Sequence, residues 1–229
     1  RALSLITRNG ESVAEELLRH RKDGSSIEVS FLGVPIRMSG GMKYSYGIYR
    51  DITERKRSEA ELLRLNSELF IAATTDKLTG LLNRQHFDEI MEREIAKSSR
   101  YGTPLSLIMI DLDNFNYQND SSGHLAGDRA LETIAGIIKD NIRTSDTAAR
   151  WGGDEFILSS PTRLEQAAAL AEKIRQLFLT LTHDGFGPIK ASFGVSSYLE
   201  CDTVDSLTKR ADGSMYGAKR NGGNLVVSS

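Results

Sequence analysis

The chain has 229 residues, of which 39% are hydrophobic and 26% charged, and its formal net charge at pH 7 is −2. This balance predicts a soluble globular protein of one ordinary domain or two small ones, and the weak charge argues against a chain built mainly to neutralise nucleic-acid phosphates. Cys201 is the only cysteine, which excludes an intramolecular disulfide and fits a reducing compartment.

The chain carries no sign of export or of a membrane span. Its first residues have neither a leading Met nor the charged-then-apolar pattern of a secretion signal, and no apolar run approaches the ~20 residues that cross a bilayer. We therefore expect a piece of a longer protein, with neighbouring segments and membrane spans left open. For the piece itself we expect a cytoplasmic location and no contact with membrane or nucleic acid.

Residues 1–52 alternate polar and apolar side chains in the way that is typical of β-strands. We expect three antiparallel strands and two turns, with strands at 12–20, 27–31 and 44–51 and turns at 22–25 and 39–41. Three strands make a thin core, so this sheet is expected to be incomplete or to be supported by a partner.

The next segment is expected to be a helix. From Thr53, a plausible N-cap, the chain runs without Gly or Pro to about Thr75. Four of its apolar residues follow the 3-4-3 spacing of a short coiled-coil seam: Leu62, Leu65, Leu69 and Ala72. The seam favours pairing with a second copy of the chain, and packing of the helix on its own domain is the alternative.

From Asp76 onward the pattern changes to alternating helices and strands. We expect helices with apolar faces at 87–95, 130–138, 167–178 and 206–219, strands at 105–110, 189–196 and 225–227, and a hairpin at 147–159. Hairpin and crossover strands together predict an α+β domain on a mixed sheet flanked by helices.

Two groups of acids lie where a ligand can reach them. Asp154 and Glu155 directly follow Gly152-Gly153, and glycines accept positive φ and let a bulky ligand approach the backbone. Asp111 lies at the end of the apolar strand at 105–110. Solvated turn acids are the alternative, but two acidic groups in one domain predict an oxygen-ligand Mg²⁺ site that holds a triphosphate.

An ordered series of motifs runs through this part of the chain. The motifs are Asp76 to Arg84 (DKLTGLLNR), Asp111 to Phe115 (DLDNF), Asn119-Asp120, Gly123-His124, Gly127-Asp128, Gly152 to Phe156 (GGDEF) and Ala218-Lys219. In this series residues 76–227 resemble the GGDEF domain of diguanylate cyclases along its whole length. Residues 1–52 resemble the C-terminal half of a PAS sensor domain, notably at 21–25 (RKDGS) and 49–55 (YRDITER).

The resemblance implies three parts: a partial PAS domain at 1–52, a helical coiled-coil linker at 53–75 and a GGDEF domain with a palm-like sheet at 76–229. It implies that Asp111, the carbonyl of Leu112 and Asp154 bind Mg²⁺, with Mn²⁺ as a possible substitute. Asp154 would also be the base that activates a ribose 3′-hydroxyl, and Glu155 would assist at the metal or the ribose. Consecutive strand residues face opposite sides, so we favour Asp154 for catalysis.

The resemblance also implies the nucleotide contacts. Asn119 and Asp128 match the positions that read guanine, whose N1–H and exocyclic amine both donate to a carboxylate, whereas adenine presents an acceptor at N1. Phe115, Asn116 and Lys219 match positions around the triphosphate. For Asp128 the alternative is an ordinary acid in the first turn of a helix.

Three other residues invite simpler interpretations. His124 is as well explained by a structural hydrogen bond at a helix start as by a ligand contact, and Trp151 and Phe156 are most simply core residues.

The sequence departs from the family pattern at two positions. Asn116 stands where the family usually has Lys, and Gly223 where it usually has Arg. Each lost charged hydrogen bond to phosphate would cost roughly 1.5–3 kcal/mol. Lys219 is retained and Arg220 is close by in sequence, so we expect a working enzyme that binds GTP weakly.

One domain of this kind holds one GTP, while cyclic di-GMP contains two guanosines, so the resemblance implies a homodimer. It further implies product inhibition, because Arg143-Thr-Ser-Asp146 lies at the offset before Gly152 where the family often has an RxxD site, and Lys173 stands where some members have a supporting Arg.

The expected function is a PAS-gated, dimeric diguanylate cyclase that condenses two GTP into cyclic di-GMP, releases pyrophosphate and is inhibited by its product. The first alternative is a weakly active or inactive module that binds GTP or cyclic di-GMP and regulates a neighbouring domain. The second is a sensor-driven dimerisation unit. The PAS signal, and whether a phosphodiesterase domain follows Ser229, stay open.

Overall fold

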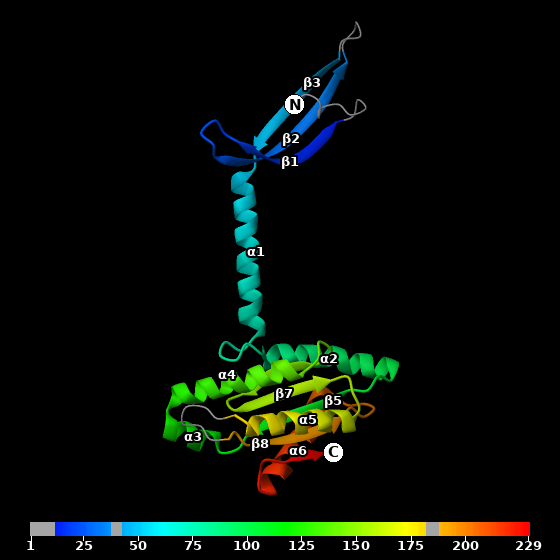
Figure 1. Cartoon of the computed structure of the whole chain (residues 1–229). Helices are drawn as coiled ribbons and strands as arrows, with labels where there is room; N and C mark the ends of the chain where they lie inside the picture. Colours follow the sequence, from blue (N-terminus) through cyan, green and yellow to red (C-terminus); the bar gives the residue numbers. More distant parts are fainter. Residues whose placement is uncertain (1–11, 38–42, 182–187) are drawn as a thin grey trace. The chain divides into compact units, whose positions relative to one another are not determined.

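The computed structural model describes residues 12–37, 43–181 and 188–229 (Figure 1). The chain divides into two compact units, Arg1–Leu69 and Phe70–Ser229, and each is described here by itself. The turn expected at 39–41 lies outside the described residues.

The first unit contains a three-stranded antiparallel sheet in the order β1-β2-β3. Its elements are β1 (Val13–His20), β2 (Ser26–Arg37), β3 (Lys43–Asp51) and most of helix α1 (Thr53–Thr74). The sheet buries little: Val29 and Phe31 are 6% and 3% exposed, and the Phe31 ring lies 4.7 Å from that of Tyr49. The expected strands and the thin core are confirmed.

Helix α1 starts differently from the sequence prediction. The Lys56 N–H donates to the Ile52 carbonyl at 2.9 Å, so Ile52 is the N-cap and Thr53 is the first helical residue. The Thr53 hydroxyl instead accepts a bond from the Glu28 N–H at 3.3 Å. The prediction of Thr53 as N-cap was wrong by one residue, because its side chain is used to tie the helix to strand β2.

The second unit is built on a six-stranded mixed sheet in the order β4-β6-β7-β5-β8-β9 (Figure 1). The strands are β4 (Leu82–Asn83), β5 (Ser106–Leu112), β6 (Thr147–Gly152), β7 (Glu155–Ser160), β8 (Ala191–Ser197) and β9 (Val226–Ser228). β5 pairs antiparallel with both β7 and β8, and the two edge strands pair parallel with their neighbours. The expected α+β class with a mixed sheet is confirmed.

Five helices follow the last turn of α1 in this unit: α2 (Arg84–Tyr101), α3 (Phe115–Ser122), α4 (His124–Asn141), α5 (Leu164–Leu179) and α6 (Val204–Arg220). Helices α4 and α5 pack on one face of the sheet, and α2 and α6 pack on the other. Helix α3 was not predicted, because its sequence, FNYQNDSS, has no apolar periodicity.

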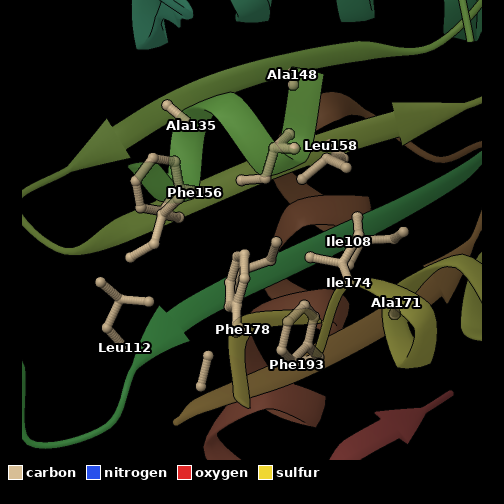
Figure 2. Close-up of a cluster of buried hydrophobic side chains, with 14 of the residues drawn as sticks. Ile108, Leu112, Ala135, Ala148, Phe156, Leu158, Ala171, Ile174, Phe178 and Phe193 are labelled. Atoms are coloured by element: carbon tan, nitrogen blue, oxygen red, sulfur yellow. The ribbon is translucent and has the colours of Figure 1, made fainter. Parts of the chain in front are cut away.

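The central strand β5 explains why the sheet is covered on both faces. All seven of its residues are buried. Its sequence, SLIMIDL, therefore has a continuous apolar stretch in the middle and not the alternation of a strand with one exposed face. Ile108 and Ile110 join a cluster with Phe156, Phe178 and Phe193 on the α4–α5 face (Figure 2), and Leu107 and Met109 join the cluster on the α2–α6 face. The strand is thereby held on both sides up to its last residue.

Gly194 of β8 allows α6 to pack closely on the sheet. A Cβ added at this position would overlap the carbonyl oxygen of Ala211 and the amide nitrogen of Met215, which are backbone atoms that cannot rotate away. We expect Gly194→Ala to lower the free energy of unfolding by about 3 kcal/mol in denaturant titrations followed by circular dichroism.

Gly136 of α4 is the matched control, since nothing lies within 4 Å of a Cβ added there. Gly136→Ala should raise the stability by up to about 1 kcal/mol, because alanine is the better helix former. Equal stability of the two variants would contradict the close contact between β8 and α6.

Candidate active site

The site begins where β5 ends. Asp111 of β5 is the register partner of Glu155 on the adjacent strand β7. The Leu112 N–H donates to the Asp154 carbonyl at 3.3 Å. The Leu112 side chain is 2% exposed and belongs to the core, so only its backbone can serve a ligand. The register thus places the strand-end acid beside the glycine turn, as the sequence predicted.

Asp111 is a buried acid with one neighbouring positive charge, Lys219, and two neighbouring negative charges, Asp154 and Asp113. Its side chain is 9% exposed, and its Oδ1 lies 2.6 Å from Nζ of Lys219, at the C-terminal end of α6. Apart from this ion pair, Oδ1 has no hydrogen-bond partner in the described part of the chain. Burial raises the pKa of the Asp111 carboxyl; Lys219 acts in the opposite direction, and the charges of Asp154 and Asp113 raise the pKa further.

The glycine turn between β6 and β7 leaves its backbone bare. Gly153 has a φ of +48°, which favours glycine, and a Cβ added at Gly152 or Gly153 would have nothing within 4 Å. Asp154 follows in this turn and is half-buried. The turn therefore has open space beside its backbone, which a large ligand can enter.

Glu155 begins β7 on the face that carries α2 and α6. It lines a cavity of about 470 Å³ together with Trp151, Arg84 and Asp212. Burial raises the pKa of Glu155, and the charges of Asp111, Asp154 and Asp212 add to the effect. An acid whose charged form is disfavoured in this way suits a proton-accepting or cation-binding role.

The two aromatic residues of the hairpin pack as expected. Phe156 is fully buried, and Trp151 is partly buried against Phe87, with ring centroids 6.2 Å apart. The Arg84 guanidinium lies 4.1 Å from the centroid of the Trp151 ring, a cation–π contact.

Arg150 fixes the shape of the turn, which the sequence analysis did not recognise. Its Nε and Nη2 donate to the Gly153 carbonyl at 3.0 and 2.8 Å, and its Nη1 lies 3.3 Å from both carboxylate oxygens of Asp76. The peptide that leads into Asp154 is therefore held by a side chain. The signal was available, since Asp76 lies within one matched motif and Arg150 lies two residues before another.

The residues expected to read the base lie around the junction of α3 and α4. Nδ2 of Asn119 lies 3.1 Å from Nδ1 of His124, which supports the structural interpretation of that histidine. Asn119 Oδ1 is buried without a partner among the described residues. The Asn119 amide also packs against Gly127 so closely that a Cβ there would overlap it.

Asp128 and Phe115 differ from the simplest expectations. Helix α4 begins at His124, so Asp128 is an exposed acid of the second turn, and the alternative of a first-turn helix acid does not apply. Phe115 is 6% exposed and packs in the core, so its side chain cannot contact a substrate. If residue 115 contacts a nucleotide, it does so through its backbone.

The two departures from the family pattern have different surroundings. Asn116 is exposed in the first turn of α3. Gly223 has a φ of +73°, and a Cβ added to it would lie 2.9 Å from Oδ2 of Asp113. A side chain at position 223 would therefore be strained by the positive φ and would lie close to Asp113.

The three residues assigned to product inhibition lie around one pocket. Arg143, Asp146 and Lys173 line a cavity of about 310 Å³ between the end of α4 and α5. Asp146 Oδ2 accepts from the Arg143 N–H at 2.8 Å, and its Oδ1 accepts from the Ser160 hydroxyl at 2.7 Å. The tetrapeptide is thus a closed turn that leaves the Arg143 side chain exposed.

Within residues 12–37, 43–181 and 188–229, no three Asp, Glu, His or Cys side chains converge closely enough to hold a metal ion on their own. No helix among these described residues is long and apolar enough to span a bilayer.

The second unit is thus an α+β domain with an acidic site at the C-terminal end of its central strand β5, beside the glycine turn between β6 and β7. The family model described as "Diguanylate cyclase, GGDEF domain" matches residues 73–225. This match covers more than half of the 229 residues, and the chain belongs to that family.

The chain is 36% identical to diguanylate cyclase DgcM of Escherichia coli (strain K12) over 208 residues, which are 90% of this chain and 49% of that protein. It is 40% identical to diguanylate cyclase A of Treponema denticola over 188 residues, 79% of this chain and 51% of that protein. The chain thus spans about half the length of these curated relatives.

Among solved structures, the coiled coil and GGDEF domain of DgcB from Caulobacter crescentus, in complex with cyclic di-GMP, superposes with a TM-score of 0.70 at 31% identity. The match covers 77% of this chain and 97% of that one.

The surroundings of Gly223 predict that restoring the family's arginine there will not help. Gly223→Arg must place a side chain at positive φ against Asp113, so we expect a loss of about 1–3 kcal/mol in the free energy of unfolding. Asn116→Lys, at an exposed position, should stay within about 0.5 kcal/mol of the unmodified chain. Denaturant titration of both variants measures this, and a Gly223→Arg variant as stable as Asn116→Lys would refute the structural reason for the glycine.

Proposed function

We propose that this chain is a diguanylate cyclase module, which condenses two GTP into cyclic di-GMP and releases two pyrophosphates. The observation that carries the proposal is Asp111, a buried carboxylate that is paired with Lys219 and still has a raised pKa, beside the bare turn that carries Asp154. The relatives named diguanylate cyclases and the family match give this site its chemistry.

The residues at the end of β5 fit a divalent cation. Burial is the main cause that raises the pKa of the Asp111 carboxyl, the charges of Asp154 and Asp113 raise it further, and Lys219 acts against both. A cation bound beside this carboxylate would therefore be stabilised. Asp111, the Leu112 carbonyl and Asp154 would hold Mg²⁺, or Mn²⁺, because both ions prefer oxygen ligands. Such an ion would neutralise charge developing on the α-phosphate.

The chain's own residues carry the proton and position the reacting groups. Asp154 accepts the proton of the ribose 3′-hydroxyl, the 3′-oxygen forms a bond to the α-phosphorus of the other GTP, and the bond to the departing pyrophosphate breaks. Glu155 assists at the ribose or at the cation. Lys219 supplies positive charge beside Asp111 and the phosphates.

Guanine is the base that suits the α3–α4 junction. Asn119 offers a buried acceptor without a partner, and Asp128 offers an exposed carboxylate. Guanine presents N1–H and an amine to such acceptors, whereas adenine would leave them unpaired, so GTP is the preferred substrate over ATP.

Two copies of the chain are needed for the reaction, because each copy holds one GTP. Helix α1 offers the device for pairing: Leu62, Leu65 and Leu69 are 59%, 42% and 66% exposed, and Ala72 continues the same stripe. An exposed apolar stripe with coiled-coil spacing is favourable only when it is covered. The DgcB structure contains a coiled coil as well.

We propose that the chain has three parts: a partial PAS sensor at 1–52, a linker at 53–75 and the catalytic domain at 76–229. The sheet of the first unit would gate the reaction through the linker. The cytoplasm, where GTP is available, is the proposed location.

The pocket lined by Arg143, Asp146 and Lys173 is proposed to bind the product. An arginine can stack on a guanine and contact phosphate, and Lys173 adds a second charge. The alternative is a module that binds nucleotide without turnover. It is favoured only by the neutral Asn116 and Gly223, and the surroundings of Gly223 weaken that support.

The activity test compares the two site acids with a surface acid. With GTP and Mg²⁺, the unmodified chain should form cyclic di-GMP, identified by mass. Asp154→Ala and Asp111→Ala should each lower kcat by about a hundredfold or more, because one loses the base and both lose a cation ligand. Asp140→Ala, on the exposed side of α4, should leave the rate unchanged. Wild-type rates in either site variant would remove the proposed site.

Product inhibition gives a separate prediction. Arg143→Ala should weaken cyclic di-GMP binding in calorimetry about tenfold or more, since a charged, stacked contact is lost. The initial rate should be unchanged, and inhibition by added product should be relieved. Arg93→Ala, at an exposed position of α2, is the control. Binding of cyclic di-GMP that does not depend on Arg143 would contradict the proposal that the product binds in this pocket.

A further inference from the structure

Asp113, the second acid of the strand-end motif, has both carboxylate oxygens engaged. Its Oδ1 accepts from the Ser192 hydroxyl at 2.8 Å, and its Oδ2 accepts from the Asn224 N–H at 2.7 Å. Its own N–H donates to the Lys190 carbonyl at 2.9 Å. The donors are neutral groups of β8 and of the turn before β9, so Asp113 is used inside the fold although it lies two residues from Asp111.

The turn that Asp113 holds has an unusual backbone. Gly222, Gly223 and Asn224 have φ values of +106°, +73° and +52°, three successive residues in the positive region. Such a run costs free energy for the non-glycine residue and persists only where contacts fix it. The Asp113 carboxylate lies against Gly223, where there is no room for a Cβ.

The same turn ends helix α6. The Gly223 N–H donates to the Ala218 carbonyl at 3.1 Å, and the Gly222 N–H donates to the Lys219 carbonyl at 3.2 Å. These bonds satisfy the last carbonyls of the helix. The conformation of the turn therefore decides where α6 stops, and Lys219 lies in its final turn with Nζ at 2.6 Å from Asp111.

A second side chain holds the turn from the direction of α5. Nη1 of Arg175 donates to the carbonyl and to Oδ1 of Asn224 at 3.2 and 3.0 Å. Glu172 holds the guanidinium in turn through two bonds of 2.8 and 2.7 Å. Hydrogen bonds from Arg175 and Gln176 lower the pKa of Glu172 to about 2, so this support is present at neutral pH.

We propose that Asp113 is a positioning residue and not a cation ligand: together with Arg175 it clamps the Gly222–Asn224 turn, and the clamped turn keeps Lys219 directed at Asp111. Asp111 then contacts the ligand, and Asp113 stabilises the turn that positions Lys219. The kinetic part of this inference rests on the proposed function, whereas the structural part does not.

The test uses two substitutions that separate the two roles. Asp113→Asn keeps the shape, since its carbonyl can accept from the Asn224 N–H and its amide can donate to the Ser192 hydroxyl. Asp113→Ala loses both bonds. A cation ligand would not tolerate either change, because both remove its charge.

Hydrogen exchange at 222–226 is the first readout. Asp113→Ala should speed exchange of the Asn224 amide about tenfold or more, as expected when a charge-assisted bond is broken, and Asp113→Asn should stay within about threefold of the unmodified chain. Asp205→Ala, which removes an exposed acid that forms an ion pair with Lys209 in the first turns of α6, is the control. Wild-type exchange in Asp113→Ala would overturn the clamp.

The Mg²⁺ dependence of GTP turnover is the second readout. Asp113→Asn should need the same Mg²⁺ concentration for half-maximal rate, and Asp113→Ala should lower kcat/KM about tenfold at saturating Mg²⁺. A strongly raised Mg²⁺ requirement in Asp113→Asn, with exchange unchanged, would make Asp113 a ligand and overturn the proposal.

Arg175→Ala keeps the proposal testable if Asp113→Ala does not fold. It should speed exchange at Asn224 as well, because Arg175 holds the same turn. If Asp113→Ala does fold, the effects of the two substitutions should not add. Unchanged exchange in Arg175→Ala would contradict the clamp. If the unmodified chain makes no cyclic di-GMP, the proposed function fails, and the exchange measurements still decide the clamp.

Discussion

The burial of Asp111 at the end of the central strand is the constraint around which the second unit is organised. A carboxylate that is 9% exposed must be paired or bind a cation if it is to stay charged, and Lys219 is the cation that pairs with Asp111. Against this stand the charges of Asp154 and Asp113, which raise the pKa of Asp111 further. The site is therefore built with a deficit of positive charge. The divalent cation proposed to bind with the nucleotide would remove that deficit, and its binding would then stabilise the site.

The rest of the site can be understood as support for this arrangement. Strand β5 is buried along its whole length, so its last residue is held from both faces of the sheet. Arg150 fixes the peptide before Asp154 and is itself fixed by Asp76, close to the end of helix α1. Within this unit, Nδ2 of Asn83 also bonds to the Ala73 carbonyl in the last turn of α1, at 2.7 Å. The end of α1 and the residues that follow it are thus tied to β4 and, through Asp76 and Arg150, to the glycine turn.

Much of the fold, and the positions of the acids at the end of β5 and after the glycine turn, could be predicted because they leave local patterns. The apolar run at 105–110 and the two glycines before Asp154 have one simple structural interpretation each. Helix α3 could not be predicted, because its polar sequence forms a helix only through packing of Phe115 in the core and of Asn119 on α4. Gly223 was interpreted as a missing arginine, since the contact that excludes a side chain comes from Asp113, more than a hundred residues earlier in the sequence. Long-range contacts of this kind leave no periodicity and no motif.

The central claim is that two copies, each holding one GTP beside Asp111 and Asp154, join the two nucleotides. The most direct test is the initial rate of cyclic di-GMP formation per chain, measured with saturating GTP and Mg²⁺ over a broad range of chain concentrations. The account predicts that the rate per chain falls toward zero on dilution and rises to a plateau as pairs form, with cyclic di-GMP as the product by mass. A rate per chain that is independent of concentration for a chain shown by light scattering to be monomeric throughout would contradict it.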